Sequence, residues 1–106
     1  MSSQRIVIVA TLTVRVAELD AFREFERHAA KVMARHGGAI ERSVFASVDG
    51  APELAREIHF VTFPSEAAFA RYRADPELAA RAALRDRAVV SSELVIGVEG
   101  PDYGPG

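Results

Sequence analysis

The stretch from residue 57 to 63, EIHFVTF, is followed directly by Pro64-Ser65 and then by residues that favour a helix. Its β-branched and aromatic residues predict a strand. Proline stops that strand, and Ser65 is a good N-cap because its hydroxyl accepts a free backbone N–H of the first helical turn. Residues 57–63 therefore predict a strand that is followed directly by a helix capped by Ser65, and the rest of the fold is predicted outward from this junction.

The chain before this junction predicts a helix between two strands. Residues 6–14, IVIVATLTV, are apolar and β-branched, which is typical of a strand. Apolar side chains recur every three or four residues over 18–36, which predicts a helix, and Gly37-Gly38 ends it. A less regular strand follows over 39–48, and the turn signal Asp49-Gly50 predicts a hairpin with the strand described above.

The chain after the junction predicts a broken helix and a last strand. Asp75 is a capping residue and Pro76 suits the first helical position, so the helix restarts there and runs to about residue 87. Residues 91–99, SSELVIGVE, predict the fourth strand. The order β-α-β-β-α-β is the ferredoxin-like motif, an α+β fold with one four-stranded antiparallel sheet. Residues 1–99 are expected to form this single domain, and 100–106 a flexible tail.

Composition excludes several classes of function. With 49% apolar and 26% charged residues, the chain is expected to be globular rather than disordered. The net charge is −2 and basic and acidic residues alternate along the first helix, which argues against a nucleic-acid partner. No apolar run is long enough to span a membrane. There is no cysteine, so thiol chemistry is impossible and a cytoplasmic location is expected.

One face of the predicted sheet has no helix to cover it. If the even-numbered residues of the first strand face the helices, the outward face is apolar, and it is expected to pair two copies of the chain. A large exposed apolar patch marks an interaction surface, and a symmetric homodimer is the commonest solution. The alternative is that the tail or a loop covers this face. The residues assigned to the patch are Val7, Val9, Val61, Phe63 and Val95.

Four short motifs in the second half resemble a known family. They are Phe63-Pro64-Ser65, Ala67-Ala68-Phe69, Asp75-Pro76-Glu77-Leu78 and Leu84-Arg85. In this order they resemble domain-of-unknown-function family 1330, in the superfamily of dimeric α+β barrels that also holds antibiotic-biosynthesis monooxygenases and muconolactone-isomerase-like enzymes. The resemblance implies two ferredoxin-like sheets packed face to face. The chain departs from the family at Leu78, where an aromatic residue is usual.

His59 and Glu57 are the candidate catalytic residues. They lie two residues apart in one strand, so their side chains point to the same face. A carboxylate beside an imidazole can orient it for general acid–base catalysis. The alternative is that His59 bonds a group of a second copy. The outward face assigned above would contain both residues, which favours this alternative.

Arg85 is the candidate for binding substrate. It stands in the Leu-Arg motif of the family that the chain resembles, and a guanidinium can hold a carboxylate or enolate oxygen with two hydrogen bonds. The alternative is a structural ion pair with Glu57 or Asp86. Tyr72 and Phe69 are expected to line a cavity between helix and sheet, although aromatic residues at helical spacing also form ordinary cores.

Two functions remain open. The first is a small dimeric enzyme or binding protein that acts on an aromatic or carbonyl compound without a cofactor, in the manner of a monooxygenase or an isomerase. The second is a non-catalytic dimeric module that regulates or binds a partner. No metal site is expected, because His28 and His36 are eight residues apart and no metal-binding spacing occurs. An open pocket that holds Arg85 or His59 would favour the enzyme.

Overall fold

The predicted sheet is present in the computed structural model of the chain, which describes residues 4–105. Its antiparallel strands are β1 (Ile6–Arg15), β2 (Ala39–Ser47), β3 (Leu54–Phe63) and β4 (Val89–Gly97), in the spatial order β2-β3-β1-β4. Strands β3 and β4 begin at Leu54 and Val89, slightly earlier than predicted. Residues 1–3 and 106, which the predicted domain and tail include, lie outside the described residues.

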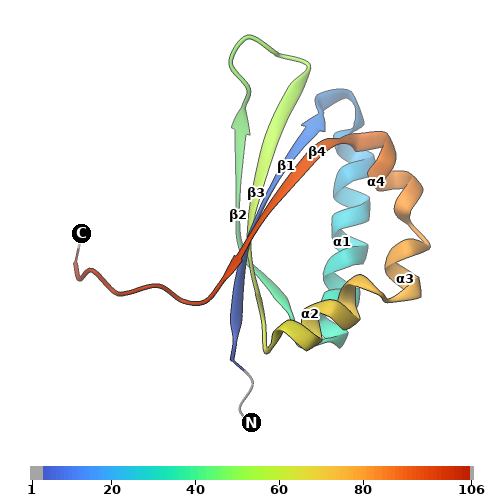
Figure 1. Cartoon of the computed structure of the whole chain (residues 1–106). Coiled ribbons are helices and arrows are strands. Elements are labelled where there is room, and N and C mark those ends of the chain that lie inside the picture. The colour runs from blue at the N-terminus through green and yellow to red at the C-terminus, as the bar shows by residue number, and fades with distance from the viewer. Residues whose placement is uncertain (1–3, 106) are drawn as a thin grey trace.

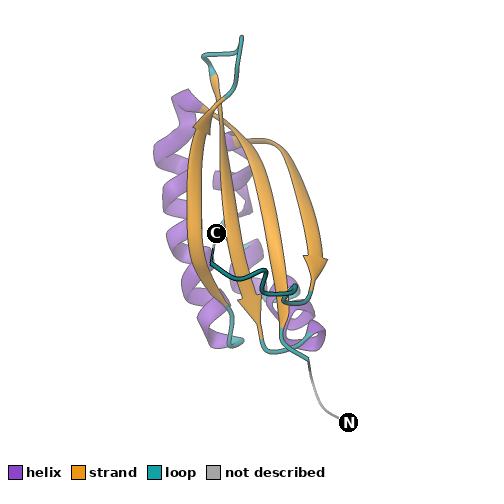
Figure 2. Ribbon diagram, turned by 90° about the vertical axis from the view of Figure 1, so that its left-hand side faces the viewer, coloured by secondary structure: helices purple, strands orange, loops and turns teal. Residues whose placement is uncertain are grey.

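All helices lie on one face of the sheet (Figures 1 and 2). A 3-10 turn, η1 (Val16–Glu18), leads into α1 (Leu19–Arg35), and three short helices precede β4: α2 (Glu66–Arg73), α3 (Pro76–Ala79) and α4 (Ala82–Ala88). The expected caps are confirmed, since the Ser65 hydroxyl accepts from the Ala68 amide at 3.1 Å and the Asp75 carboxylate from the Glu77 amide at 2.9 Å. No helix among the described residues is long and apolar enough to cross a membrane.

The register of the sheet corrects the assignment of its two faces. Ile6 pairs with Phe63 and Ile8 with Val61, and directly paired residues of antiparallel strands point to the same side. The even-numbered residues of β1 therefore share a face with the odd-numbered residues of β3. Val61 and Phe63 are buried under the helices, 5% and 1% exposed, so placing them on the outward patch was wrong.

The helix-facing core is divided into two clusters. One lies beneath α2 and the end of α1, and the other lies beneath α4 and the start of α1. Between them, the middle of β1 carries only the small Ala10 on this face, opposite His59 of β3. The core is therefore interrupted at mid-sheet. The buried members of the first cluster are Ile6, Ile8, Met33, Val61, Phe63 and Ala68; those of the second are Leu12, Val14, Phe22, Ala55 and Ala88.

Gly38 is a position where packing leaves no room for a side chain. A Cβ atom there would lie 2.4 Å from Phe63 Cε1 and 2.7 Å from Met33 Cγ. Because both neighbours are buried, we expect Gly38→Ala to lower the free energy of unfolding by about 1–3 kcal/mol, measured by urea denaturation. Gly100→Ala is the control, since a Cβ atom at Gly100 meets nothing within 4 Å. Equal stability of the two variants would contradict this packing.

Candidate functional site

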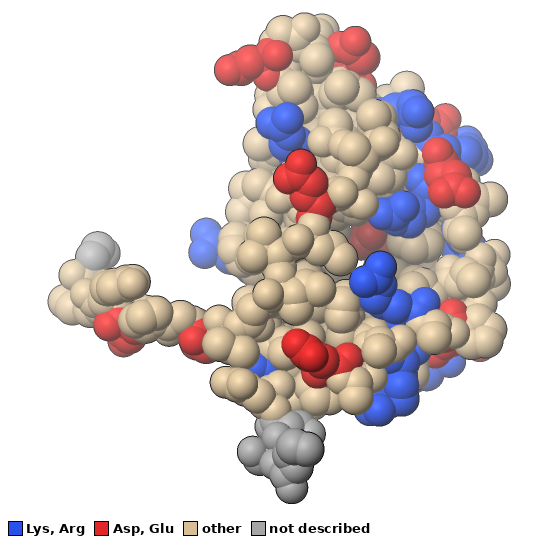
Figure 3. Space-filling model, in the orientation of Figure 1, with Lys and Arg blue, Asp and Glu red and all other residues tan. Residues whose placement is uncertain are grey.

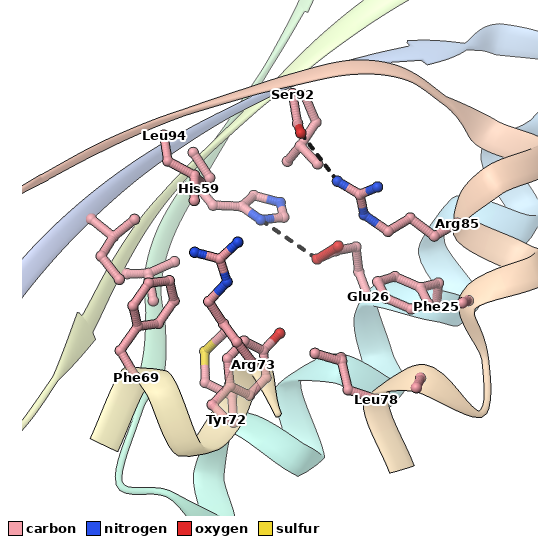
Figure 4. A pocket seen from close by; sticks show the side chains of 17 residues that line it. Phe25, Glu26, His59, Phe69, Tyr72, Arg73, Leu78, Arg85, Ser92 and Leu94 are labelled. Atoms are coloured by element: carbon pink, nitrogen blue, oxygen red, sulfur yellow. Dashed lines mark hydrogen bonds and ion pairs between the residues drawn. The ribbon is translucent and has the colours of Figure 1, made fainter. Parts of the chain in front are cut away.

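A pocket of about 450 Å³ opens between the two core clusters, bounded by the sheet on one side and by α1 to α4 on the other. Figure 4 shows its lining, in which apolar and aromatic side chains surround a few polar groups. Pockets of this size and composition are typical of small-molecule sites. Among the residues predicted from the sequence, His59, Phe69, Tyr72 and Arg85 line it.

His59 lies at the base of the pocket between two carboxylates. Its Nε2 is 2.7 Å from Glu57 Oε2, and its Nδ1 is 3.6 Å from Glu26 Oε2 (Figure 4). The histidine is 5% exposed and its ring stacks on Phe22 with centroids 6.4 Å apart. If Nε2 donates its hydrogen to ionised Glu57, Nδ1 is the nitrogen free to accept a proton. The predicted pairing of His59 with Glu57 is present, on the helix-facing side rather than the outward side.

Glu26 is a site residue that the sequence analysis did not single out. It projects from α1 toward His59, and burial raises the pKa of its carboxyl group above the usual 4.5, while the nearby His59 lowers it and Glu57 raises it further. A carboxyl group whose pKa is raised by burial can hold or release a proton closer to neutral pH. The signal in the sequence was a glutamate on the apolar stripe of α1, next to Phe25.

Arg85 lies at the same end of the pocket, half-buried on α4. Its guanidinium donates to Ser92 Oγ at 3.2 Å, and its charge lowers the pKa of Glu26. No carboxylate lies within ion-pair distance of Arg85 among residues 4–105, so neither Glu57 nor Asp86 is its partner there. The guanidinium is therefore available to an oxygen of a bound molecule.

Aromatic side chains form the wall on the α2 side. Phe69 and Tyr72 stack with centroids 6.3 Å apart, and both pack against Phe63. Burial raises the pKa of Tyr72 to about 12, with a further upward contribution from the charge of Glu26. The Tyr72 hydroxyl therefore keeps its proton at neutral pH and can donate a hydrogen bond.

The corner between α2 and α3 is tied to the end of α1. His36 Nε2 is 2.8 Å from Asp75 Oδ2, and Arg35 Nη2 is 2.6 Å from Glu77 Oε2. These contacts fix the segment that follows α2, which carries pocket residues such as Leu78. They also give His36 a partner beyond the end of its own helix. No group of three or more metal-ligating side chains occurs among the described residues.

The chain has the ferredoxin-like α+β fold, and three solved structures share it. A protein of unknown function from Rhodopseudomonas palustris is 20% identical with a TM-score of 0.77, covering 94% of this chain and 85% of its own. SnoaB, a cofactor-independent oxygenase from Streptomyces nogalater, is 18% identical with a TM-score of 0.67, covering 97% and 100%. A candidate antibiotic biosynthesis monooxygenase from Nitrosomonas europaea is 16% identical with a TM-score of 0.67, covering 100% and 98%.

Comparisons of the sequence itself identify no relative. No protein-family model matches the chain and no curated protein matches it. Membership of family 1330 therefore stays a prediction. The ferredoxin-like fold of the single chain is confirmed, whereas the face-to-face packing of two sheets stays a prediction.

The raised pKa of Glu26 predicts how stability depends on pH. Between pH 4.5 and the higher pKa of the folded protein, the unfolded chain loses this proton first. The free energy of unfolding therefore falls as the pH rises through that window, and above it the cost of the buried charge is fully present. We expect Glu26→Gln to be more stable than the natural protein at pH 8 and to lose that advantage near pH 4, measured by urea denaturation.

The control for this prediction is Glu24→Gln, on the same helix. Glu24 is exposed and lies 3.5 Å from Arg81 in a surface ion pair, and such pairs contribute little. The free energy of unfolding of Glu24→Gln should depend on pH in the same way as that of the natural protein. A Glu26→Gln variant whose advantage is the same at both pH values would contradict the proton-linked cost.

Proposed function

We propose that this protein is an enzyme that transfers a proton to or from a small aromatic or carbonyl compound bound in the pocket between sheet and helices. The observation that carries the proposal is the imidazole of His59, held by Glu57 and facing Glu26 at the base of an open pocket. An imidazole oriented by a carboxylate is the arrangement that general acid–base catalysis uses.

Each side chain has a separate role in the proposed proton transfer. Nδ1 of His59 takes a proton from an acidic C–H or O–H of the substrate, and Glu57 stabilises the imidazolium that forms. Arg85 and the Tyr72 hydroxyl stabilise the oxygen on which negative charge develops. Glu26 receives the proton from His59 or returns it to the product. The negative charge that forms on the substrate is delocalised over its enolate or phenolate group.

A more specific form of the proposal is a monooxygenase reaction. A phenolic substrate that has lost its proton can itself reduce dioxygen. One oxygen atom replaces the hydrogen on a ring carbon, and that carbon becomes a carbonyl. The other oxygen atom leaves as water, which takes the ring hydrogen and the phenolic hydrogen of the substrate. The likeness of fold to SnoaB supports this outcome, but fold alone does not fix function. Without dioxygen, the same proton transfer moves a double bond, as an isomerase does.

The open pocket also weighs against the non-catalytic alternative. A fully packed interface between helices and sheet would leave no room for a substrate, whereas here about 450 Å³ is open and both His59 and Arg85 line it. Figure 3 shows acidic and basic side chains interspersed on this side of the molecule rather than a single charged patch for a macromolecule.

A homodimer through the uncovered face of the sheet is part of the proposal. This face carries no helix (Figure 2), and Val95 on its edge strand β4 is 68% exposed. We expect a dimer at micromolar concentration in sedimentation equilibrium; a monomer would contradict it. The apolar residues that the register places here are Val7, Val9, Val44, Ile58, Phe60 and Val95.

The direct test is proton exchange on a defined compound. Phenylpyruvate has an acidic methylene group whose hydrogens are replaced by deuterium in D₂O, and proton NMR follows their loss. We expect the protein to accelerate this exchange and Arg85→Ala to slow it by about 10²–10³-fold, because a charge that stabilises the enolate oxygen is lost. Arg81→Ala, at the start of the same helix but outside the pocket lining, is the control. Exchange no faster than in buffer would contradict the proposed function.

A further inference from the structure

We propose that the substrate is an aromatic acid whose carboxylate binds Arg73 at the mouth of the pocket. This inference rests on the proposed function and names the class of substrate for the same site. Arg73 lines the pocket together with Arg85, and the sequence analysis did not single it out. Figure 4 shows its guanidinium turned inward, toward the side of the pocket where His59 lies.

Arg73 is held in place without being neutralised. It lies in the last turn of α2, and its guanidinium carbon is 5.4 Å from the centre of the Phe69 ring. Such stacking restricts the side chain while leaving the N–H groups at its edge free. Among residues 4–105, no carboxylate lies within 4 Å of this guanidinium, whereas exposed arginines elsewhere, such as Arg35 and Arg87, have acidic partners.

The charges at the two ends of the pocket decide where a carboxylate can bind. The end at which His59 lies already holds Glu26 and Glu57, burial opposes ionisation of Glu26, and the cation of this end, Arg85, is assigned to the oxygen of the reacting group. A permanent negative charge next to them would be repelled. Arg73 is exposed and has no carboxylate within 4 Å among residues 4–105, so a carboxylate bound to it keeps part of its hydration and meets a cation. The substrate is therefore oriented with its carboxylate on Arg73 and its reacting group between His59 and Arg85.

The shape of the site favours a flat acid over a phosphate. A carboxylate matches the planar fork of one guanidinium with two parallel hydrogen bonds, whereas a phosphate dianion needs more donors than this single arginine offers. The wall beside Arg73 consists of the stacked rings of Phe69 and Tyr72, on which an aromatic ring packs well. The volume of about 450 Å³ accommodates one or two fused rings.

The test compares two ligands of nearly the same shape, one with a charged carboxylate and one with a neutral amide. The dissociation constants of 2-naphthoate and its neutral amide, 2-naphthamide, are measured by fluorescence titration, without turnover. We expect the natural protein to bind the acid about tenfold more tightly than the amide, which corresponds to a charge-assisted hydrogen-bonded pair. In Arg73→Ala this ratio should fall to about one, with the affinity for the amide nearly unchanged. Arg73→Lys should retain part of the ratio, because it keeps the charge and loses the planar fork.

The matched control is Arg71→Ala, which removes an exposed arginine of the same helix that does not line the pocket. It should keep the full preference for the acid. Equal affinity of the natural protein for both ligands, or an unchanged ratio in Arg73→Ala, would overturn the inference even if proton exchange on phenylpyruvate is observed. Conversely, a preference that depends on Arg73 in a protein that exchanges no protons would contradict the proposed function and leave Arg73 as a binding site for an aromatic acid.

Discussion

Replacement of His59 by alanine is expected to slow proton exchange on phenylpyruvate by about 10²–10⁴-fold, the usual contribution of a positioned acid–base group. The physical reason is that His59 lines the pocket with Nδ1 3.6 Å from Glu26, another lining residue, while Nε2 is held 2.7 Å from Glu57. Neither carboxylate occupies the position of the imidazole, which has one ring nitrogen to donate a hydrogen bond and one to accept a proton. The effect should fall on the rate of the chemical step, with little change in the affinity for 2-naphthoate, because the ligand contacts of Arg73 and Phe69 remain.

Chemical rescue distinguishes this role from a structural one. His59→Ala leaves a space the size of an imidazole next to Glu57 and Phe22, so added imidazole should restore part of the rate. Circular dichroism and thermal unfolding establish that the variant is folded. A folded variant with the full rate would contradict the role of His59, and a slow variant that imidazole does not improve would indicate that His59 supports the pocket rather than moves protons.

Phe63→Ala is expected to give the largest loss of stability, about 3–5 kcal/mol in the free energy of unfolding. Phe63 is 1% exposed and contacts the rings of Phe69 and Tyr72 at centroid distances of 5.3 and 5.4 Å. Its removal leaves a cavity beneath α2 that the surrounding side chains cannot fill by small movements. Urea denaturation at several protein concentrations is the measurement.

Phe60→Ala is the matched control, in the same strand but on the opposite face. If the uncovered face pairs two copies, dimer formation contributes to stability. The loss of stability in Phe60→Ala should then change with protein concentration, whereas the loss in Phe63→Ala should be the same at every concentration. A loss below about 1 kcal/mol in Phe63→Ala would contradict the packing described here, since truncation of a buried phenylalanine costs several times more.

The elements of the fold could be predicted because their signals are local. Ser65 and Asp75 cap helices through atoms only two or three residues away, and the apolar composition of 6–14 needs no partner to be recognised. The faces of the strands could not be assigned in the same way. Whether Phe63 points in or out depends on which residue of β1 it pairs with, and Ile6 is that residue only through the register of two strands far apart in the sequence.

The part of the site that could be predicted from the sequence also has a local signal. His59 and Glu57 are two residues apart in one strand, so their pairing follows from strand geometry alone. Glu26 approaches His59 from α1, and Arg73 reaches the pocket only because α2 ends there before the chain turns at Asp75. Contacts of this kind arise from the packing of helices on the sheet, which a single sequence does not specify.

In the proposed mechanism, His59 is oriented by Glu57 and presents Nδ1 to a ligand in the pocket. Long-range ¹H–¹⁵N spectra of protein with ¹⁵N-labelled histidine test it most directly, because they resolve both ring nitrogens of His28, His36 and His59 and report which of them carries hydrogen. We expect neutral His59 to carry its hydrogen on Nε2, and addition of 2-naphthoate to shift the Nδ1 signal of His59 while His28 and His36 stay unchanged. Hydrogen on Nδ1 of His59, or ligand binding that leaves the His59 signals unmoved, would contradict the account.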